Sequence, residues 1–324
     1  MRLRWVFASI VTAALVAGWI WVAYRQNSLA NESRDRAQTI LALEEQLGAA
    51  RQEIARQEQV AQRESLRRQT LAGANRSPDE FLALFPARFP QGDWQPAESH
   101  FEDCWFRSAD GLRLHGWLLV HERPRHVLLL VHGNAGNLTH RAATAQYLSE
   151  RYSATVFVFD YRGYGRSEGT PTIPGLLDDA RAARQLLAQR AGVSEPAIVL
   201  LGESLGGAIA VDLAAADGAR ALVLQSTFSS LKEVAAAHYP AMLVDVLVAN
   251  RLDSAAKIKQ FRGPLLQFHG QADRTIPFAL GRKLFDAANQ PKTFMALPRH
   301  DHNHPLPEQY YQRLDEFMAR LGDR

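Results

Sequence analysis

Residues 200–209 read LLGESLGGAI and place one serine, Ser204, between two glycines at the end of an apolar run. The preceding AIVLL (197–201) is typical of a buried strand, and the following LGGAIAVDLAAA predicts a helix. A glycine-x-serine-x-glycine string between a strand and a helix is the setting of a nucleophile elbow, a sharp turn that exposes the serine. Gly202 and Gly206 lack the side chains that would collide in such a turn. We therefore interpret Ser204 as a nucleophile rather than an ordinary turn serine.

The chain after residue 100 alternates strands with helices. Two alternating stretches joined around Asp110-Gly111 predict a β-hairpin. Further strands are expected in the runs HVLLLVHG, ATVFVFD, AIVLLG, ALVLQS, PLLQFHG and TFMAL. Helices are expected to start near Leu138, Gly175, Leu205 and Phe278, with a last one in PEQYYQRLDEFMARL. The pattern predicts an α/β fold with a mainly parallel sheet flanked by helices, whose chemistry lies at the carboxyl ends of the strands.

A serine hydroxyl near neutral pH is a poor nucleophile, so it needs a base and an acid that orients the base. Asp273 follows the strand PLLQFHG, and histidines follow the strand TFMAL. The chain order Ser204, Asp273, His302 is the nucleophile, acid and base order of one known triad arrangement. Asp160 also ends a strand, but it precedes the serine, and we interpret it as a structural loop residue.

Three histidines, His300, His302 and His304, alternate along one segment after the last strand. In an extended segment they could face one way, and with Asp301 they leave a metal site as an alternative. A two-residue repeat seldom closes a tetrahedral shell without a ligand from elsewhere. We therefore expect neither a metal nor a cofactor.

The oxyanion that forms when a serine attacks a carbonyl needs preorganised N–H donors. Leu205, directly after the nucleophile, is one candidate backbone donor. The glycine-rich stretch VHGNAGN (131–137) supplies the second, with Asn134 as the expected donor. A phosphate-binding loop is the alternative for this stretch, but it lacks the Lys-Ser/Thr ending of a nucleotide loop.

Five motifs, in order, resemble the alpha/beta-hydrolase superfamily of serine hydrolases. They are His132-Gly133-Asn134, DYRGYGRSEG (160–169), Gly202-Glu203-Ser204-Leu205-Gly206, HGQAD ending at Asp273, and His302-Asn303. Within the superfamily, HGNAGN, DYRGYGRSEG and HNHP resemble the branch that includes membrane-associated acyl-protein thioesterases. In that branch the base histidine is followed by asparagine and usually by aspartate, which selects His302, although this chain has His304 at the aspartate position.

The resemblance also implies a lid at about residues 228–260, between the strands ALVLQS and PLLQFHG. Met242, Leu243, Val246 and Leu247 form an apolar stripe in this insertion. As a pocket roof, the stripe would favour a medium or long acyl chain. The alternative is that it packs on the edge of the sheet.

The first 26 residues predict a membrane anchor. Residues 5–24 carry no charge, which is the length that a helix needs to cross a bilayer, and aromatic residues lie near both ends. A cleaved secretory signal ending at Ser28-Leu29-Ala30 is the alternative. A short tail with Arg2, Arg4 and a free amine is costly to translocate, so we expect the rest of the chain on the non-cytoplasmic side.

Residues 27–76 are expected to form a helical stalk, because the apolar positions from Ile40 to Ala61 follow a 3-4 spacing. A weak parallel coiled-coil homodimer and a solitary charged helix both fit this pattern. Four prolines then make residues 77–96 a linker, so the hydrolase-like domain is expected to span residues 97–324.

Charge and cysteine content exclude some partners. Residues 1–76 contain 11 of the 37 basic residues and 7 of the 34 acidic residues. The rest of the chain therefore has 26 basic and 27 acidic residues, so the basic excess lies in the N-terminal segment. No basic cluster with interleaved aromatics follows, and we expect no nucleic-acid partner. The single cysteine, Cys104, is interpreted as a core residue.

The sequence therefore predicts a membrane-anchored serine hydrolase that cleaves esters or thioesters of a lipid-like or small acyl substrate through an acyl-serine intermediate. A serine peptidase of the same fold and a non-catalytic interaction module are the alternatives.

Overall fold

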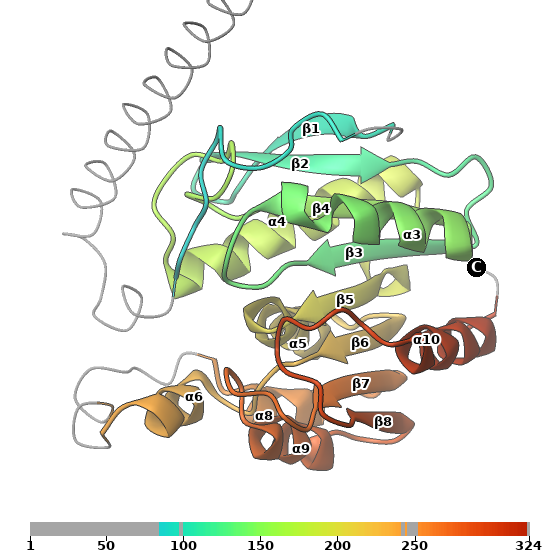
Figure 1. The fold of residues 1–324 in the computed structure, drawn as a ribbon. Helices are drawn as coiled ribbons and strands as arrows, with labels where there is room; N and C mark the ends of the chain where they lie inside the picture. The colour runs from blue at the N-terminus through green and yellow to red at the C-terminus, as the bar shows by residue number, and fades with distance from the viewer. Residues whose placement is uncertain (1–83, 97–99, 241–243, 245–251, 323–324) are drawn as a thin grey trace, which may run out of the picture. The chain divides into compact units, whose positions relative to one another are not determined.

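A single eight-stranded sheet contains every strand that the sequence predicts (Figure 1). The computed structural model describes residues 84–96, 100–240, 244 and 252–322. The strand order is β1-β2-β4-β3-β5-β6-β7-β8. The strands are β1 (Glu102–Arg107), β2 (Arg113–Leu119), β3 (His126–Val131), β4 (Ala154–Asp160), β5 (Val199–Glu203), β6 (Ala221–Gln225), β7 (Leu265–Gly270) and β8 (Lys292–Leu297).

The sheet is parallel from β4 to β8, as the continuous apolar runs predicted. The β1–β2 hairpin is antiparallel, and β2 also pairs antiparallel with β4. The hairpin turns at Asp110-Gly111, where Gly111 has a φ of 85°, in the left-handed region that favours glycine.

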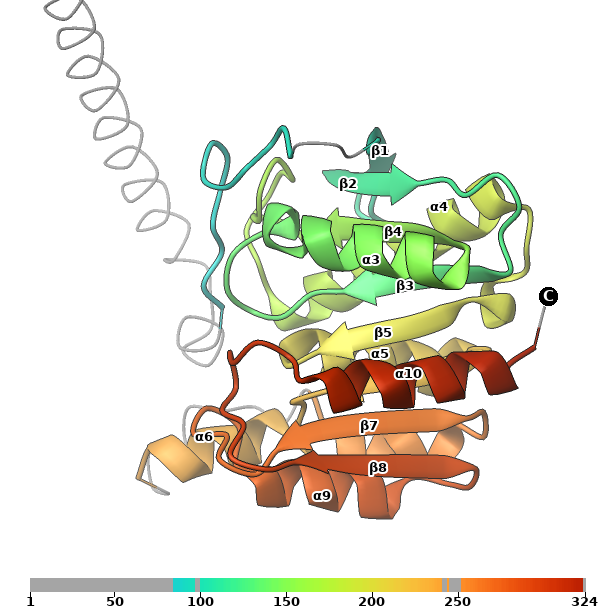
Figure 2. The ribbon, with the colours of Figure 1, turned by 45° about the vertical axis from the view of Figure 1, so that its right-hand side comes forward.

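Helices cover both faces of the sheet. They are α3 (Ala142–Tyr152), α4 (Ile173–Ala191), α5 (Leu205–Asp217), α6 (Leu231–His238), α8 (Ser254–Lys257), α9 (Phe278–Ala287) and α10 (Glu308–Arg320). Figures 1 and 2 show α3 and α10 on one face, and α4, α5 and α9 on the other. Successive residues of β3 alternate between the two resulting cores, since Val127 and Leu129 join one cluster and Leu128 and Leu130 the other.

The chain before residue 97 is already part of the fold, whereas the sequence predicted a linker there. Leu84 is buried, with 2% of its surface exposed. Pro86 and Arg88 form parallel bridges with Gly136 and Gly165. The folded region therefore starts before residue 97, because prolines that break a helix still allow an extended segment to pair with a neighbouring loop.

Several predictions fall on residues outside the described ranges. These include the anchor, the stalk and the apolar stripe of the lid, Met242, Leu243, Val246 and Leu247. Within the described ranges, no helix combines the length and the apolar character that crossing a bilayer requires. Between β6 and β7, the described parts of the insertion form α6 and α8.

Candidate active site

Ser204 lies in the sharp turn between β5 and α5, as the elbow motif predicted. Its backbone has φ 53° and ψ −119°, a strained conformation for a residue with a side chain, costing about 1–3 kcal/mol. The turn brings α5 so close to β3 that a Cβ on Gly206 would lie 2.0 Å from the Val131 carbonyl oxygen. Glycine is therefore required at position 206, and the strained turn holds Ser204 at the carboxyl end of β5.

Ser204, His302 and Asp273 form one hydrogen-bonded chain. The Ser204 hydroxyl lies 3.1 Å from Nε2 of His302, and Nδ1 of His302 lies 2.8 Å from Oδ2 of Asp273. A carboxylate only accepts hydrogen bonds, so Nδ1 carries the proton and Nε2 is free to accept from the serine. The three predicted residues thus meet in the geometry of a nucleophile, a base and an orienting acid.

The Asp273 carboxylate is fixed from its other side by the loop that follows it. Its Oδ1 accepts the backbone N–H groups of Thr275 at 2.9 Å and Ile276 at 2.7 Å. The buried His269 donates from Nε2 to the Ile276 carbonyl at 2.9 Å, and burial lowers the pKa of this imidazole. Sequence reasoning did not assign His269 a role, although it lies four residues before the acid.

Asp301 joins the loop of the histidine to the loop of the acid. Its carboxylate accepts the backbone N–H groups of Arg274 at 3.0 Å and His302 at 2.8 Å, and it also pairs with the Arg274 guanidinium. These two backbone donors, followed by the guanidinium, lower the pKa of Asp301. The sequence analysis considered Asp301 only as a metal ligand. The sequence did contain a signal for this link: Asp301 directly precedes His302, and Arg274 directly follows Asp273.

His300 and His304 contact each other rather than His302. Nε2 of His300 lies 3.2 Å from the His304 carbonyl, and Nδ1 of His304 lies 3.3 Å from the Asp301 nitrogen. In the part of the chain that the structure describes, no three histidine, cysteine or acidic side chains are grouped as metal ligands. Of the three alternating histidines, the structure brings His302 to the serine.

The loop 132–137, here called the oxyanion loop, lies beside Ser204. A Cβ on Gly133 would be 3.5 Å from the Ser204 Cβ, so the backbone approaches the nucleophile closely. Within the described residues, the backbone N–H groups of Asn134 and Leu205 have no hydrogen-bond partner. Leu205 is the first residue of α5, where a helix leaves its N–H groups unpaired. The two N–H groups predicted as oxyanion donors are therefore unpaired among the described residues, and their role stays a prediction.

Asp160 is buried beneath the oxyanion loop, as expected of a structural residue. Its Oδ1 accepts the Leu138 N–H at 2.8 Å. It lies 3.7 Å from Nε2 of His132, within the range of an ion pair. Burial, however, raises the pKa of Asp160 to about 8 and lowers that of His132 to about 3. Burial therefore disfavours the charged form of both groups, and with it an ion pair between them.

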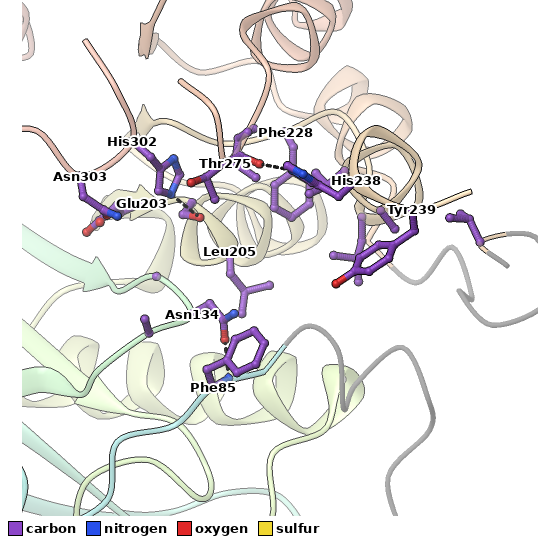
Figure 3. A pocket seen from close by; sticks show the side chains of 18 of the residues that line it. Phe85, Asn134, Glu203, Leu205, Phe228, His238, Tyr239, Thr275, His302 and Asn303 are labelled. Atoms are coloured by element: carbon purple, nitrogen blue, oxygen red, sulfur yellow. Dashed lines mark hydrogen bonds between the residues drawn. The ribbon is translucent and has the colours of Figure 1, made fainter. Parts of the chain in front are cut away.

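A pocket of about 490 Å³ opens at Ser204 and His302 (Figure 3). One wall comes from the lid insertion and the residues around it, and it is largely apolar. This wall consists of Phe228, Leu231, Val234, Ala235, Tyr239, Val244 and Ile276. Nε2 of His238, on α6, donates to the Thr275 carbonyl at 2.8 Å, which connects α6 to the loop of Asp273.

The pocket lining also includes a charged pair that the sequence analysis did not identify. Nε of Arg141 lies 3.0 Å from Glu203 Oε2, and both side chains line the pocket. Glu203 directly precedes the serine, so its position is set by the same turn. The pocket therefore combines an apolar wall with an ion pair of no net charge.

Two proteins of known sequence are similar to more than two thirds of this chain. The protein YfhR of Escherichia coli K12 is 35% identical over 234 residues, which cover 68% of this chain and 76% of that protein. Protein bem46 of Schizosaccharomyces pombe is 31% identical over 252 residues, covering 73% of this chain and 84% of that protein.

Among solved structures, the Pyrococcus furiosus esterase Pf2001 superimposes with a TM-score of 0.62 at 18% identity, covering 74% of this chain and 98% of the esterase. Acetyl xylan esterase 1 from Thermoanaerobacterium gives 0.53 at 21% identity, covering 71% of this chain and 86% of that enzyme. At these identities the likeness concerns the fold. The model of the alpha/beta hydrolase fold matches residues 126–312, more than half of the chain, and the chain belongs to this family.

Proposed function

We propose that the protein is a serine hydrolase that cleaves carboxylic esters or thioesters through an acyl-serine intermediate. The observation that carries the proposal is the hydrogen-bonded chain from Asp273 through His302 to Ser204 at the mouth of a largely apolar pocket. Membership of the alpha/beta hydrolase family supports hydrolytic chemistry.

In the first half of the proposed reaction, Ser204 Oγ attacks the substrate carbonyl carbon while its proton passes to His302 Nε2. The carbonyl oxygen becomes an oxyanion, which the N–H groups of Asn134 and Leu205 stabilise. The bond to the alkoxide or thiolate leaving group then breaks, and His302 returns the proton to it. Asp273 accepts from Nδ1 throughout and stabilises the imidazolium that forms.

In the second half, water attacks the acyl-serine carbonyl and gives its proton to His302. The tetrahedral intermediate collapses, the acid product leaves, and the proton returns to Ser204. Each turnover thus consumes one ester or thioester and one water, and it requires no cofactor.

The apolar wall favours a medium or long acyl chain, since methylene groups that leave water for such a wall stabilise the complex. Residues 5–24 are proposed to hold the enzyme in a membrane, with the hydrolase domain on the non-cytoplasmic side. Lipid-like substrates at the same surface would then reach the pocket.

The test is a series of p-nitrophenyl acetate, octanoate and palmitate, an acyl thioester, and aminoacyl anilides, assayed with the full chain. We expect turnover of the esters and the thioester, highest for the longer chains. Ser204→Ala should lower kcat by about 10⁴- to 10⁶-fold without unfolding the protein. Ser194→Ala is the matched control, because Ser194 is exposed and precedes β5, whereas Ser204 follows it.

Anilide turnover without ester turnover would favour a peptidase. A folded wild type that hydrolyses none of these substrates would favour a non-catalytic module and contradict the proposal.

A further inference from the structure

Residues 84–91, here called the strap, run alongside the oxyanion loop. The Ala87 N–H donates to the Gly136 carbonyl at 3.0 Å. Nδ2 of Asn137 donates to the Gln91 carbonyl at 2.7 Å. The strap lies outside the part of the chain that matches the hydrolase family, residues 126–312. The strap therefore makes several contacts with the loop that lies beside Ser204.

The decisive contact is made to Asn134. The Phe85 backbone N–H donates to Oδ1 of Asn134 at 2.9 Å, and the Tyr164 hydroxyl donates to the same oxygen at 3.1 Å. An amide oxygen has two lone pairs, so these two donors saturate it. Figure 3 shows Phe85 beside Asn134, with Leu205 next to them. The side chain of Asn134 is thus held from two sides while its backbone N–H stays unpaired among the described residues.

The second donor is itself held by the strap. Gly165, next to Tyr164, donates its N–H to the Ala87 carbonyl and accepts the Phe89 N–H, both at 2.9 Å. Tyr164 is fully buried. The strap therefore ties two loops together, and both loops contribute to the position of Asn134.

The composition of the oxyanion loop explains why it needs hydrogen bonds from another segment to be ordered. It contains Gly133 and Gly136, and Gly136 adopts a φ of 85°. Glycine loses more conformational freedom on ordering than any other residue, so a glycine-rich loop is poorly ordered by its own sequence. An oxyanion donor is effective only when it is already in place before charge develops.

We propose that the strap positions the Asn134 backbone N–H for the oxyanion, and that Phe85 is the positioning residue, acting through its own N–H on the Asn134 side chain. This inference rests on the proposed hydrolase activity. It predicts that Phe85 has two separable roles. Its N–H increases the rate of the chemical step by holding Asn134 in place. Its ring, which lines the pocket, contributes to substrate binding.

The test compares Phe85→Pro, which lacks the N–H, with Phe85→Ala, which keeps it and lacks the ring. In the full chain, the kcat of Phe85→Pro for p-nitrophenyl octanoate should be about tenfold or more below the kcat of Phe85→Ala. Phe85→Ala should raise KM with little change in kcat. In an Asn134→Ala background, Phe85→Pro and Phe85→Ala should give the same kcat, because the acceptor of the N–H is already gone.

Hydrogen–deuterium exchange supplies a readout that does not depend on turnover. Two hydrogen-bonded amides report on the contact: that of Ala87, which donates to the Gly136 carbonyl, and that of Asn137, which donates to Nδ1 of His140. Both should exchange faster in Phe85→Pro than in Phe85→Ala, and Tyr164→Phe should increase exchange at Asn137 without altering the strap. Three results would each overturn the inference: equal kcat for the two Phe85 variants, a difference between them that persists in the Asn134→Ala background, or unchanged exchange at the amides of Ala87 and Asn137. An inactive wild type would refute the hydrolase proposal instead, and the exchange result would still decide whether the strap orders the loop.

Discussion

At the scale of single residues, Asp301 holds His302, the proposed base, through its backbone. The family resemblance led us to expect an aspartate two positions after His302, where this chain has His304. Asp301 instead precedes the base and bonds the backbone of both His302 and Arg274. The carboxylate thereby links the two loops that carry the base and the acid.

Replacing Asp301 should therefore slow catalysis. We expect Asp301→Ala to lower kcat about tenfold with a small change in KM, because a displaced imidazole weakens proton transfer. Asp301→Asn, which retains an acceptor oxygen, should retain more activity. Steady-state kinetics checks this, with Asp286→Ala as the control, since Asp286 is an exposed acid in another Arg–Asp pair.

The pH dependence of this link follows from the lowered pKa of Asp301. A carboxylate whose folded-state pKa is depressed stabilises the fold above its unfolded pKa, near 4, and loses that contribution as pH falls through the folded value. The link should thus remain intact throughout the neutral range. An activity loss in Asp301→Ala that appears only below about pH 5 would contradict its role.

Asp160 gives the opposite pH dependence. Burial raises its pKa to about 8, so between about pH 4 and 8 the folded state holds a proton that the unfolded state has lost. Asp160 alone should therefore make stability fall with rising pH in this window, by at most about 1.4 kcal/mol per pH unit. The lowered pKa of His132 acts in the opposite direction below about pH 6.5, so the Asp160 contribution is the difference between wild type and variant. Urea unfolding at several pH values checks this against Asp160→Asn, which cannot titrate. Parallel stability profiles for wild type and variant would refute the assignment.

The site could be predicted from the sequence where the chemistry follows from chain order. Ser204, Asp273 and His302 each follow a strand, and parallel strands end at one edge of the sheet. Choosing His302 required the family resemblance, because alternation alone does not distinguish His300 and His304. The contacts of Asp301 were missed, although its place next to His302 was a signal. The Arg141–Glu203 pair could not be predicted, because it joins two segments 62 residues apart. The hydrogen bond from His269 to the Ile276 carbonyl likewise leaves no pattern in the sequence.

At the scale of elements, the eight strands and the helices beginning near Leu138, Gly175, Leu205 and Phe278 could be predicted, because apolar runs and caps are local signals. The strap could not. Its prolines indicate a linker, whereas its pairing with Gly136 and Gly165 depends on loops about 50 and 80 residues away. Contacts with distant segments leave no periodic pattern in the sequence.

The lid helix α6 should set the preference for chain length. Val234 lies on α6 and lines the pocket, so Val234→Trp should fill part of the space available to an acyl chain. We expect kcat/KM for p-nitrophenyl palmitate to fall at least tenfold more than that for the acetate, since overfilling costs about 1–3 kcal/mol. Ala236→Trp is the control, because Ala236 is exposed on the same helix. An equal loss for both esters would show that this wall does not contact the acyl chain.

At the scale of the whole molecule, the N-terminal segment is expected to place the hydrolase domain at a membrane. The full chain should sediment with membranes and resist extraction by alkaline carbonate. Placing arginines at Ala14 and Val16, in the middle of the uncharged run, should release it, since each charge costs about 2.5–3.5 kcal/mol at the centre of a bilayer. Release of the wild-type chain by carbonate would contradict the anchor, and a reporter fused after residue 324 would determine the side.

The most direct test of the central claim is covalent labelling of the full chain by a fluorophosphonate probe. Attack by Ser204 Oγ forms an oxygen–phosphorus bond and expels fluoride, so peptide mass spectrometry should find the label on Ser204. We expect labelling to be abolished in Ser204→Ala, reduced at least 10³-fold in rate in His302→Ala, and largely retained in His300→Ala and His304→Ala. A folded wild type that is not labelled, or a label rate that His302→Ala leaves unchanged, would contradict the account.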